Sequence, residues 1–131
     1  MTPHAGEAAA LLGVAREEVE GARLAAVREL AAVYRATVLL KGSTTLVADA
    51  AGGAVRVNAT GTPWLATAGS GDVLSGLGGS LLAAGLSALD AGSVAAYLHG
   101  LAGRFAAQGA PAGAHDVAEC VPEAWRDVLE D

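Results

Sequence analysis

The residues best suited to chemistry are concentrated in one segment, Thr67-Ala68-Gly69-Ser70-Gly71-Asp72-Val73-Leu74-Ser75-Gly76. Two glycines flank a serine and lead directly into an apolar stretch with helical spacing, so the backbone can turn its N–H groups toward one point. That point lies at the N-terminus of the predicted helix, where partial positive charge favours an anion or a developing negative charge. The segment therefore predicts an anion hole formed by Gly69, Ser70 and Gly71.

Asp72 directly follows this turn, and two roles are open to its carboxylate. It can cap the helix, because aspartate is strongly preferred at the N-cap. It can also act as a general base for a hydroxyl that attacks a phosphoryl group, while the neighbouring amides stabilise charge on the transferred group. The polar and glycine-rich pattern from Thr67 to Gly76 extends beyond what a cap needs and favours the base. The segment is not a Walker loop, since no Gly-Lys-Ser/Thr follows the glycines.

Other polar residues have ordinary interpretations when each is taken alone. Lys41 follows a short apolar run and can be an exposed strand-end charge, and His4 can be an exposed histidine near the start of the chain. His99 lies in an apolar helical stretch and is interpreted as a core histidine with its hydrogen bonds satisfied. His115 and Asp116 are adjacent and are expected to cap the last helix rather than bind a metal.

The elements that position these residues follow from the periodicity and the turn signals. The first helices are expected at Glu7 to Leu12, closed by Gly13, and at Arg16 to Arg35, with one face formed by Leu24, Val27, Ala31 and Tyr34. Strands are expected at 37–40, 44–48 and 55–58, the last two joined as a hairpin by the turn at 49–53. Further helices are expected from Gly71 or Asp72 to Gly85, from an Asp90 cap to Gln108, and over 115–129 with a second start at Pro122. A helix, a buried strand and a hairpin in this order argue for an α/β sheet.

Composition limits the class of protein and its partners. A chain of 131 residues with 53% hydrophobic and 17% charged residues fits one folded domain and excludes disorder. The net charge of −6 argues against a nucleic-acid partner, although backbone N–H groups can still hold a small anion. The longest apolar stretch, 73–86, is interrupted by glycines and too short for a membrane span, and no secretion signal is apparent at the N-terminus. The single cysteine, Cys120, fits a reducing cytosol, so we expect a cytoplasmic protein.

Four segments together resemble one family. The run from Thr67 to Gly76 resembles the anion-hole motif of the ribokinase-like superfamily, in which the aspartate is the catalytic base. The wider run from Val57 to Pro63 and on to Asp72 is similar, more narrowly, to the ADP/ATP-dependent NAD(P)H-hydrate dehydratases. Agreement in order and spacing extends to three more segments: Thr2-Pro3-His4-Ala5-Gly6-Glu7, Leu40-Lys41-Gly42-Ser43-Thr44-Thr45 and Tyr97-Leu98-His99-Gly100-Leu101-Ala102-Gly103.

The resemblance implies a reaction and a role for each matching residue. Asp72 would contact the hydrated nicotinamide and act as the base on its hydroxyl, and Gly71 would supply backbone to the nucleotide and the anion hole. His4 would lie beside the hydrated dinucleotide, in a loop shaped by Gly6 and Glu7. The nucleotide-binding stretch would comprise Lys41, Gly42, Ser43, Thr44 and Thr45. The implied enzyme, a hydro-lyase, uses ADP, or ATP in some members, to phosphorylate hydrated NADH or NADPH; phosphate then leaves and NAD(P)H is restored, with Mg²⁺ accompanying the nucleotide.

The resemblance also implies a three-layer α/β/α ribokinase-like fold over residues 1–131 that lacks the N-terminal part of the domain. Missing strands would leave a parallel sheet with an uncovered edge and an exposed apolar face. We therefore expect a homo-oligomer, a partner polypeptide, or a longer native protein that covers them. Two other functions remain open: a catalytically silent, self-associating fragment, and a related small-molecule kinase acting on a vitamin precursor or sugar. The segments at His4 and Lys41 argue against the kinase, because the general superfamily motif does not require them.

Overall fold

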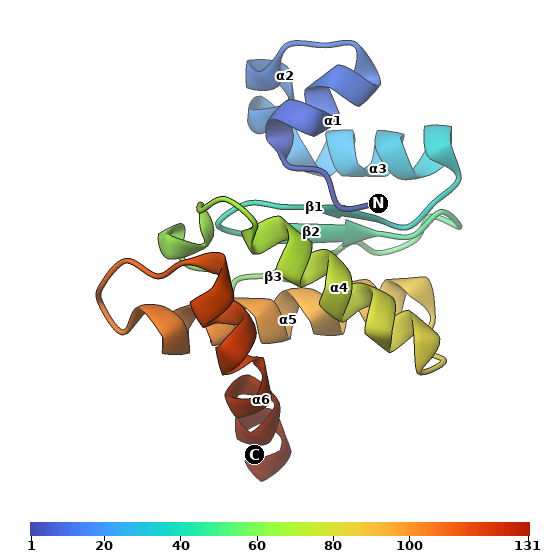
Figure 1. Ribbon diagram of the computed structural model, residues 1–131. Coiled ribbons are helices and arrows are strands. Elements are labelled where there is room, and N and C mark those ends of the chain that lie inside the picture. Colours follow the sequence, from blue (N-terminus) through green and yellow to red (C-terminus); the bar gives the residue numbers. More distant parts are fainter.

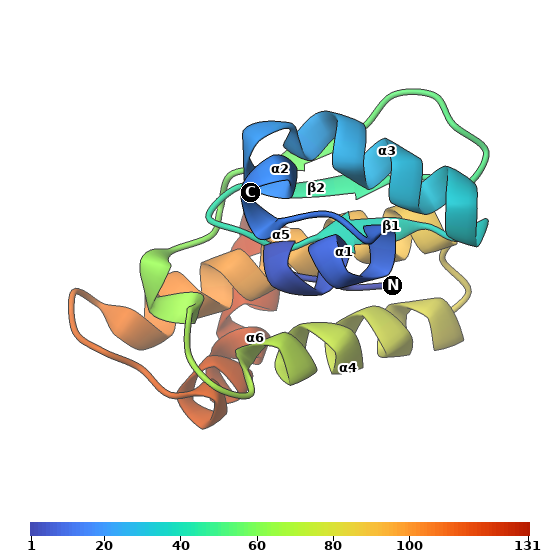
Figure 2. The same ribbon diagram turned by 90° about the horizontal axis from the view of Figure 1, so that it is seen from above.

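The computed structural model describes residues 1–131 and arranges them in three layers, with helices on both faces of one sheet (Figure 1). In chain order the elements are α1 (Ala5–Leu12), α2 (Arg16–Gly21), α3 (Arg23–Tyr34), β1 (Val38–Leu40), β2 (Thr45–Ala48), β3 (Arg56–Asn58), the short 3-10 helix η1 (Pro63–Leu65), α4 (Ser70–Ala83), α5 (Ala88–Ala107) and α6 (Ala114–Glu130). Helices α1 to α3 lie over one face, as Figure 2 shows from above, and α4 and α5 lie over the other. The predicted α/β class and the three layers are confirmed.

Alternation along the strands explains why both faces of the sheet are covered. Val38 and Leu40 of β1 join the core cluster formed with α1 and α3, whereas Leu39, between them, joins the cluster formed with α4 and α5. Successive side chains of a strand point to opposite faces, so an uninterrupted apolar run marks a strand buried on both sides. Helix α6 lies against α5 and closes a third, smaller cluster around Leu98 and Val117.

The sheet is antiparallel, and the expectation of a parallel sheet is wrong for its three strands. The strand order is β1-β2-β3, and both neighbouring pairs are antiparallel. The loop between β1 and β2 therefore closes a hairpin that periodicity did not reveal. Parallel pairing occurs only at the outer side of β1, where the Leu39 and Lys41 N–H groups donate to the Met1 and Pro3 carbonyls at 2.8 and 2.9 Å. The extended start of the chain thus carries His4 directly to the edge of the sheet.

The long helix expected over Arg16 to Arg35 is divided in two. Ala22 has φ −146° and ψ 54°, which ends α2 and begins α3. The stripe of α3 that packs on the sheet is Ala26, Val27, Leu30 and Ala31. Leu24 and Tyr34, assigned to the packing face, are 47% and 42% exposed. Val27 and Ala31 were correctly placed, whereas Leu24 and Tyr34 lie near the two ends of α3, outside the buried stripe, which includes Ala26 and Leu30 instead.

The later helices follow the prediction in type and differ at their ends. Helix α4 begins at Ser70 and ends at Ala83, slightly before the expected bounds. Ser87, rather than Asp90, caps α5: its hydroxyl accepts from the Asp90 N–H at 3.2 Å. Asp116 does stabilise the start of α6, where its carboxylate accepts from the Gly113 N–H at 2.8 Å. Pro122 lies inside a continuous α6 and starts no second helix. No helix is both long enough and apolar enough to cross a membrane.

Candidate functional site

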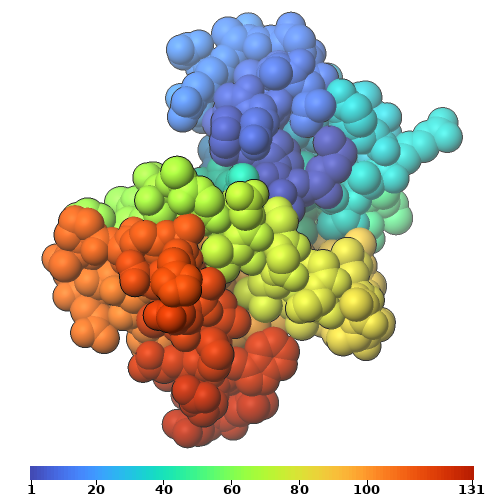
Figure 3. All heavy atoms as spheres, viewed as in Figure 1, coloured from blue at the N-terminus to red at the C-terminus, as the bar shows by residue number.

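One large cleft lies where four predicted segments meet. Its volume is about 890 Å³, and it is bounded by the start of the chain, the β1–β2 loop, η1 and the first turn of α4. The space-filling view shows the N-terminal residues in blue close to the start of α4 in yellow-green on this face of the molecule (Figure 3). The predicted site residues that line the cleft are His4, Lys41, Gly42, Ser43, Gly69, Ser70, Gly71, Asp72 and Thr45. Thr44 does not line it.

The glycine turn before α4 presents unpaired backbone N–H groups. Gly69 is the N-cap with φ +85°, a left-handed conformation that glycine adopts without strain. The Ser70 N–H donates to the Thr67 carbonyl at 3.2 Å, and the Asp72 N–H donates to the Gly69 carbonyl at 3.1 Å. The Gly69 and Gly71 N–H groups have no partner within the chain. The predicted glycine turn is therefore present and leaves two N–H groups free, but Ser70 contributes no free amide to it.

Asp72 does not cap the helix. It is the third residue of α4, the cap position belongs to Gly69, and no side chain caps this helix. The Asp72 side chain is exposed and forms no hydrogen bond or ion pair, although Asp72 lines the cleft. Its carboxylate is therefore available to accept a proton or to bind a ligand.

Lys41 points at the glycine turn rather than into solvent. Its side chain is 24% exposed, and a Cβ added to Gly71 would lie 2.7 Å from the Lys41 Nζ. The interpretation of Lys41 as an exposed strand-end charge is thereby excluded. A positively charged ammonium and the unpaired Gly71 N–H lie side by side at the positive end of a helix, which is the electrostatic arrangement that binds phosphate.

The β1–β2 loop that carries Lys41 is held in place by Arg23. The Arg23 guanidinium donates to the carbonyls of Thr44, Leu40 and Lys41 at 2.6, 3.2 and 3.4 Å. The Thr44 carbonyl thus faces Arg23, and Arg23 itself lines the cleft. A Cβ on Gly42 would lie 2.7 Å from Arg23 Nη2 and 3.2 Å from the Thr44 carbonyl oxygen, so a side chain there would displace the guanidinium from the loop. Sequence reasoning missed Arg23, because nothing in the spacing connects it to residues 17 to 21 positions later.

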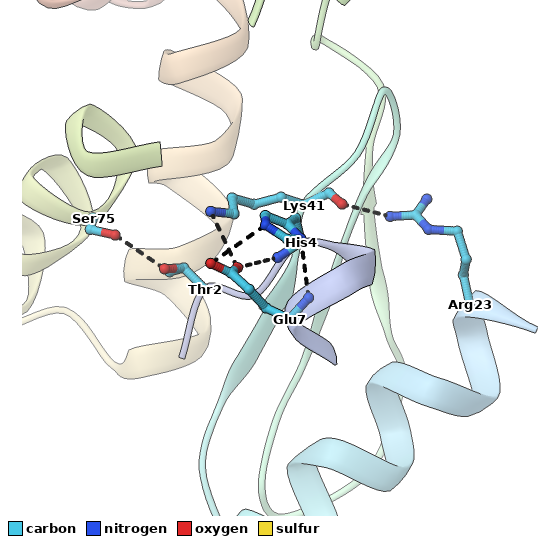
Figure 4. Close-up of polar contacts among 6 residues, drawn as sticks. All are labelled: Thr2, His4, Glu7, Arg23, Lys41 and Ser75. Carbon is cyan, nitrogen blue, oxygen red and sulfur yellow. Dashed lines mark hydrogen bonds and ion pairs between the residues drawn. The ribbon is translucent and has the colours of Figure 1, made fainter. Parts of the chain in front are cut away.

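His4 and Glu7 form a compact unit beside Lys41 (Figure 4). His4 Nδ1 accepts from the Glu7 N–H at 3.1 Å, and the Glu7 carboxylate accepts from the His4 N–H at 2.8 Å, which is a reciprocal capping box for α1. The second hydrogen bond is the largest cause of a lowered pKa for Glu7. Glu7 Oε2 lies 3.9 Å from Lys41 Nζ, so the unit also contacts the lysine. The side chain of His4 is half exposed at the cleft, where a ligand can reach it.

One hydrogen bond between side chains joins the start of the chain to α4. Thr2 Oγ1 lies 3.1 Å from Ser75 Oγ, one helical turn beyond Asp72 (Figure 4). This contact brings His4 and Asp72 to the same cleft from segments that are far apart in the sequence. The sequence had not predicted this contact between Thr2 and Ser75.

His99 is buried, as expected for a core histidine, and it contacts the glycine turn. Its Nε2 lies 3.0 Å from the Ser70 carbonyl oxygen and 3.2 Å from Ser70 Oγ. The sequence interpretation gave His99 no part in the site. The 29 positions that separate it from Ser70 leave no local pattern that could have suggested one.

This fold and this site together define a ribokinase-like α/β domain with a glycine turn and free backbone N–H groups at the start of a helix. The model of the NAD(P)H-hydrate dehydratase family matches residues 1–122, and the chain belongs to that family. It is similar to the ADP-dependent (S)-NAD(P)H-hydrate dehydratase of Neisseria meningitidis, with 51% identity over 102 residues, and to the bifunctional NAD(P)H-hydrate repair enzyme of Mycobacterium leprae, with 50% identity over 107 residues. These matches cover 78% and 82% of the chain.

A solved structure agrees in fold. The chain superimposes on the ADP/ATP-dependent NAD(P)H-hydrate dehydratase of Bacillus subtilis, which was co-crystallised with ATP and Mg²⁺, with a TM-score of 0.89 and 30% identity over 96% of its length. The superposition covers 46% of the Bacillus subtilis chain, and the matches cover 34% of the Neisseria relative and 22% of the Mycobacterium leprae relative. The chain thus spans less than half the length of each of these proteins.

Proposed function

We propose that this chain carries the nucleotide-binding and proton-accepting part of an ADP- or ATP-dependent NAD(P)H-hydrate dehydratase. The observation that carries the proposal is the convergence of the Lys41 ammonium, the free Gly71 N–H and the unpaired Asp72 carboxylate in one cleft. The Lys41 ammonium and the Gly71 N–H suit the phosphates of a nucleotide, and the Asp72 carboxylate suits a hydroxyl that must lose a proton. The names of the relatives supply the substrate class: hydrated NADH or NADPH.

The proposed reaction assigns each group one task. The hydroxyl oxygen of the hydrate attacks the terminal phosphorus of the nucleotide while Asp72 accepts the hydroxyl proton, and the nucleotide leaves one phosphoryl group shorter. Lys41 and the amides of Gly69 and Gly71 stabilise negative charge on the transferred group. The C–O bond to the phosphate then breaks, and loss of a proton from the ring restores NAD(P)H.

The remaining cleft residues are proposed to bind the two substrates. The loop residues Gly42, Ser43 and Thr45 would contact the nucleotide directly, and Thr44 would act through the loop backbone. His4, half exposed at the cleft, would contact the hydrated dinucleotide.

Mg²⁺ fits this site as an ion held by the nucleotide rather than by a protein cage. The chain has no group of three or more His, Cys, Asp or Glu side chains that could hold a metal. Mg²⁺ usually keeps several waters and is bound through substrate phosphates with one or two carboxylates. In the proposed reaction it would neutralise phosphate charge beside Lys41 and the glycine turn. The carboxylates that line the cleft are those of Glu7, Glu20 and Asp72.

We also propose that the protein works in the cytoplasm and that further polypeptide covers the outer edge of the sheet. The edge beyond β1 is formed by Met1 to Pro3, whose carbonyls at positions 1 and 3 face β1, and the Thr2 backbone groups have no partner. An unpaired edge is a surface on which another strand can add, from a second copy or from a partner polypeptide. The mass in solution tests this: a particle larger than 12.8 kDa is expected, and a stable monomer contradicts it.

The decisive experiment is ADP- or ATP-dependent conversion of NADH hydrate and NADPH hydrate by the wild type and by Asp72→Asn. A general base typically contributes about 10²- to 10⁴-fold, so a loss of that size is expected in kcat, with nucleotide affinity retained. Asp127→Asn is the matched control, because Asp127 is exposed on α6 and does not line the cleft. Undiminished turnover by Asp72→Asn overturns the base assignment.

Two other outcomes separate the alternatives. A chain that neither binds nucleotide nor converts the hydrate would identify a silent fragment. Consumption of ATP with a sugar or a hydroxymethylpyrimidine, and not with the hydrate, would identify a small-molecule kinase.

A further inference from the structure

His99 occupies an unusual place for a core histidine. It lies in the middle of α5 and is 7% exposed, yet its ring reaches the first residue of α4. Both of its contacts, to the Ser70 carbonyl oxygen at 3.0 Å and to Ser70 Oγ at 3.2 Å, are made by the same ring atom, Nε2. The reaction proposed above assigns no task to this side chain.

The contact with the carbonyl settles which ring nitrogen carries the proton. A carbonyl oxygen can only accept a hydrogen bond, so His99 Nε2 must be the donor. Ser70 Oγ then lies within reach of the same N–H as a second acceptor. Burial lowers the pKa of His99, the hydrogen bond that His99 donates to the Ser70 carbonyl opposes this, and the positive charge of Lys41 lowers it further. The ring is therefore neutral at physiological pH, with its proton on Nε2.

The carbonyl that His99 holds belongs to the peptide unit that contains the Gly71 N–H. A trans peptide is planar, and its C=O and N–H point in opposite directions. No cis peptide bond occurs in the chain. Fixing the Ser70 carbonyl on α5 therefore directs the Gly71 N–H away from α5. The Gly71 N–H has no partner within the chain, and the Lys41 ammonium lies beside Gly71 in the same cleft, which His99 also lines.

We propose that His99 is a positioning residue for the anion hole: its Nε2–H holds the Ser70–Gly71 peptide and thereby aims the Gly71 N–H at a phosphate in the cleft. The inference rests on the proposed function, in that the phosphate belongs to a nucleotide. A buried side chain on a different helix, His99 on α5, thus sets the orientation of the Gly71 amide beside Lys41.

The test compares variants that keep or remove the donor. Gln at position 99 can place an amide N–H near the position of Nε2, whereas Leu fills the space and donates nothing. For each variant the dissociation constants of ADP and of adenosine are measured, because adenosine has the same base and sugar and no phosphate.

The expected result is a loss of affinity for ADP, which carries phosphate, and not for adenosine. Because hydrogen bonds to charged groups are worth more than neutral ones, His99→Leu is expected to weaken ADP binding about tenfold or more and to leave adenosine binding unchanged. His99→Gln should stay close to the wild type for both ligands. Equal losses for ADP and adenosine, or no loss for ADP, would show that His99 only fills the core, and would overturn the inference.

A second measurement stands apart from nucleotide binding and covers the case in which His99→Leu does not fold. The ¹⁵N shifts of the imidazole in the wild-type chain report the tautomer, and a neutral ring with its proton on Nε2 is expected. A proton on Nδ1 overturns the inference even if ADP binds well. A wild type that binds ADP no better than adenosine overturns the proposed function, and this inference with it.

Discussion

The Lys41 ammonium lies 2.7 Å from the point where a side chain on Gly71 would begin. The lysine comes from the loop after β1 and the glycine from the first turn of α4, so the contact joins the two segments proposed to bind phosphate. Gly71 has no positive φ, and its lack of a side chain serves the close approach of Lys41 rather than a backbone turn.

Gly71→Ala is expected to weaken ADP binding about tenfold, because the new methyl group displaces the ammonium and a charge-assisted hydrogen bond is worth about 1.5–3 kcal/mol. The displaced atom is the far end of a flexible side chain, so the fold should tolerate the change. Alanine in a helix should even raise the free energy of unfolding by about 0.4–1 kcal/mol. The check is ADP titration calorimetry together with thermal unfolding.

Gly76→Ala is the matched control for this substitution. Gly76 lies in the same helix, and a Cβ there would meet no atom within 4 Å. It should show the same gain in stability and an unchanged ADP affinity. If Gly71→Ala also binds ADP as the wild type does, the proximity of Lys41 and Gly71 has no role in binding.

Arg23 supports the loop from which Lys41 extends, and its removal should loosen that loop. Arg23→Met deletes three donated hydrogen bonds, to Thr44, Leu40 and Lys41, while keeping much of the aliphatic stem. Each bond from a charged donor contributes about 1.5–3 kcal/mol when well formed, and the shortest of the three, to Thr44, should dominate. We expect faster amide hydrogen exchange across the β1–β2 loop and ADP affinity reduced about tenfold.

Arg28→Met controls for the loss of a positive charge on α3. Arg28 is exposed, forms no hydrogen bond or ion pair, and does not line the cleft. Exchange in the loop and ADP affinity should both stay at wild-type values. Equal effects of the two substitutions would assign the change to net charge, and not to the clamp on the loop.

Much of this arrangement could be predicted from the sequence, and the reasons for the limits are specific. The glycines around Ser70 and the apolar run after them identify an anion-binding turn locally, and the apolar run at 37–40 identifies a strand buried on both faces. Strand direction leaves no trace in periodicity, so the antiparallel pairing of β1 and β2 was missed. The contacts of Arg23 and His99 link residues 17 to 29 positions apart, and only the packed fold brings these side chains to the loop and the turn.

His99 should make stability depend on pH in the acid range. Burial lowers its pKa in the folded chain below the ordinary value of 6.5, so below that value the unfolded chain binds more protons than the folded one. Stability therefore rises with pH across this range. The contribution is fully present above pH 6.5 and is lost as the pH falls through the lowered pKa.

The measurement is the free energy of unfolding, from urea titrations between pH 5 and pH 8, for the wild type and for His99→Gln. Glutamine does not titrate, so the wild type should lose more stability than the variant between pH 7 and pH 5. The carboxylates that titrate in the acid range are common to both chains and cancel in the comparison. Parallel curves would mean that His99 has the same pKa in the folded and unfolded chains.

Thr2 and Ser75 should be energetically coupled, because their hydroxyl groups form the hydrogen bond between the start of the chain and α4. Thr2→Val and Ser75→Ala each remove one partner, and the double substitution removes both. A hydrogen bond contributes about 0.5–1.5 kcal/mol net, and solvent access at this site favours the lower value. The double-mutant cycle should therefore give a coupling energy of about 0.5 kcal/mol, obtained from urea unfolding.

Ser80→Ala provides the control cycle with Thr2→Val, since the Ser80 hydroxyl bonds only within its own helix, to the Leu77 carbonyl. That cycle should be additive, and additivity in the Ser75 cycle as well would show that the two segments are not coupled through these hydroxyl groups.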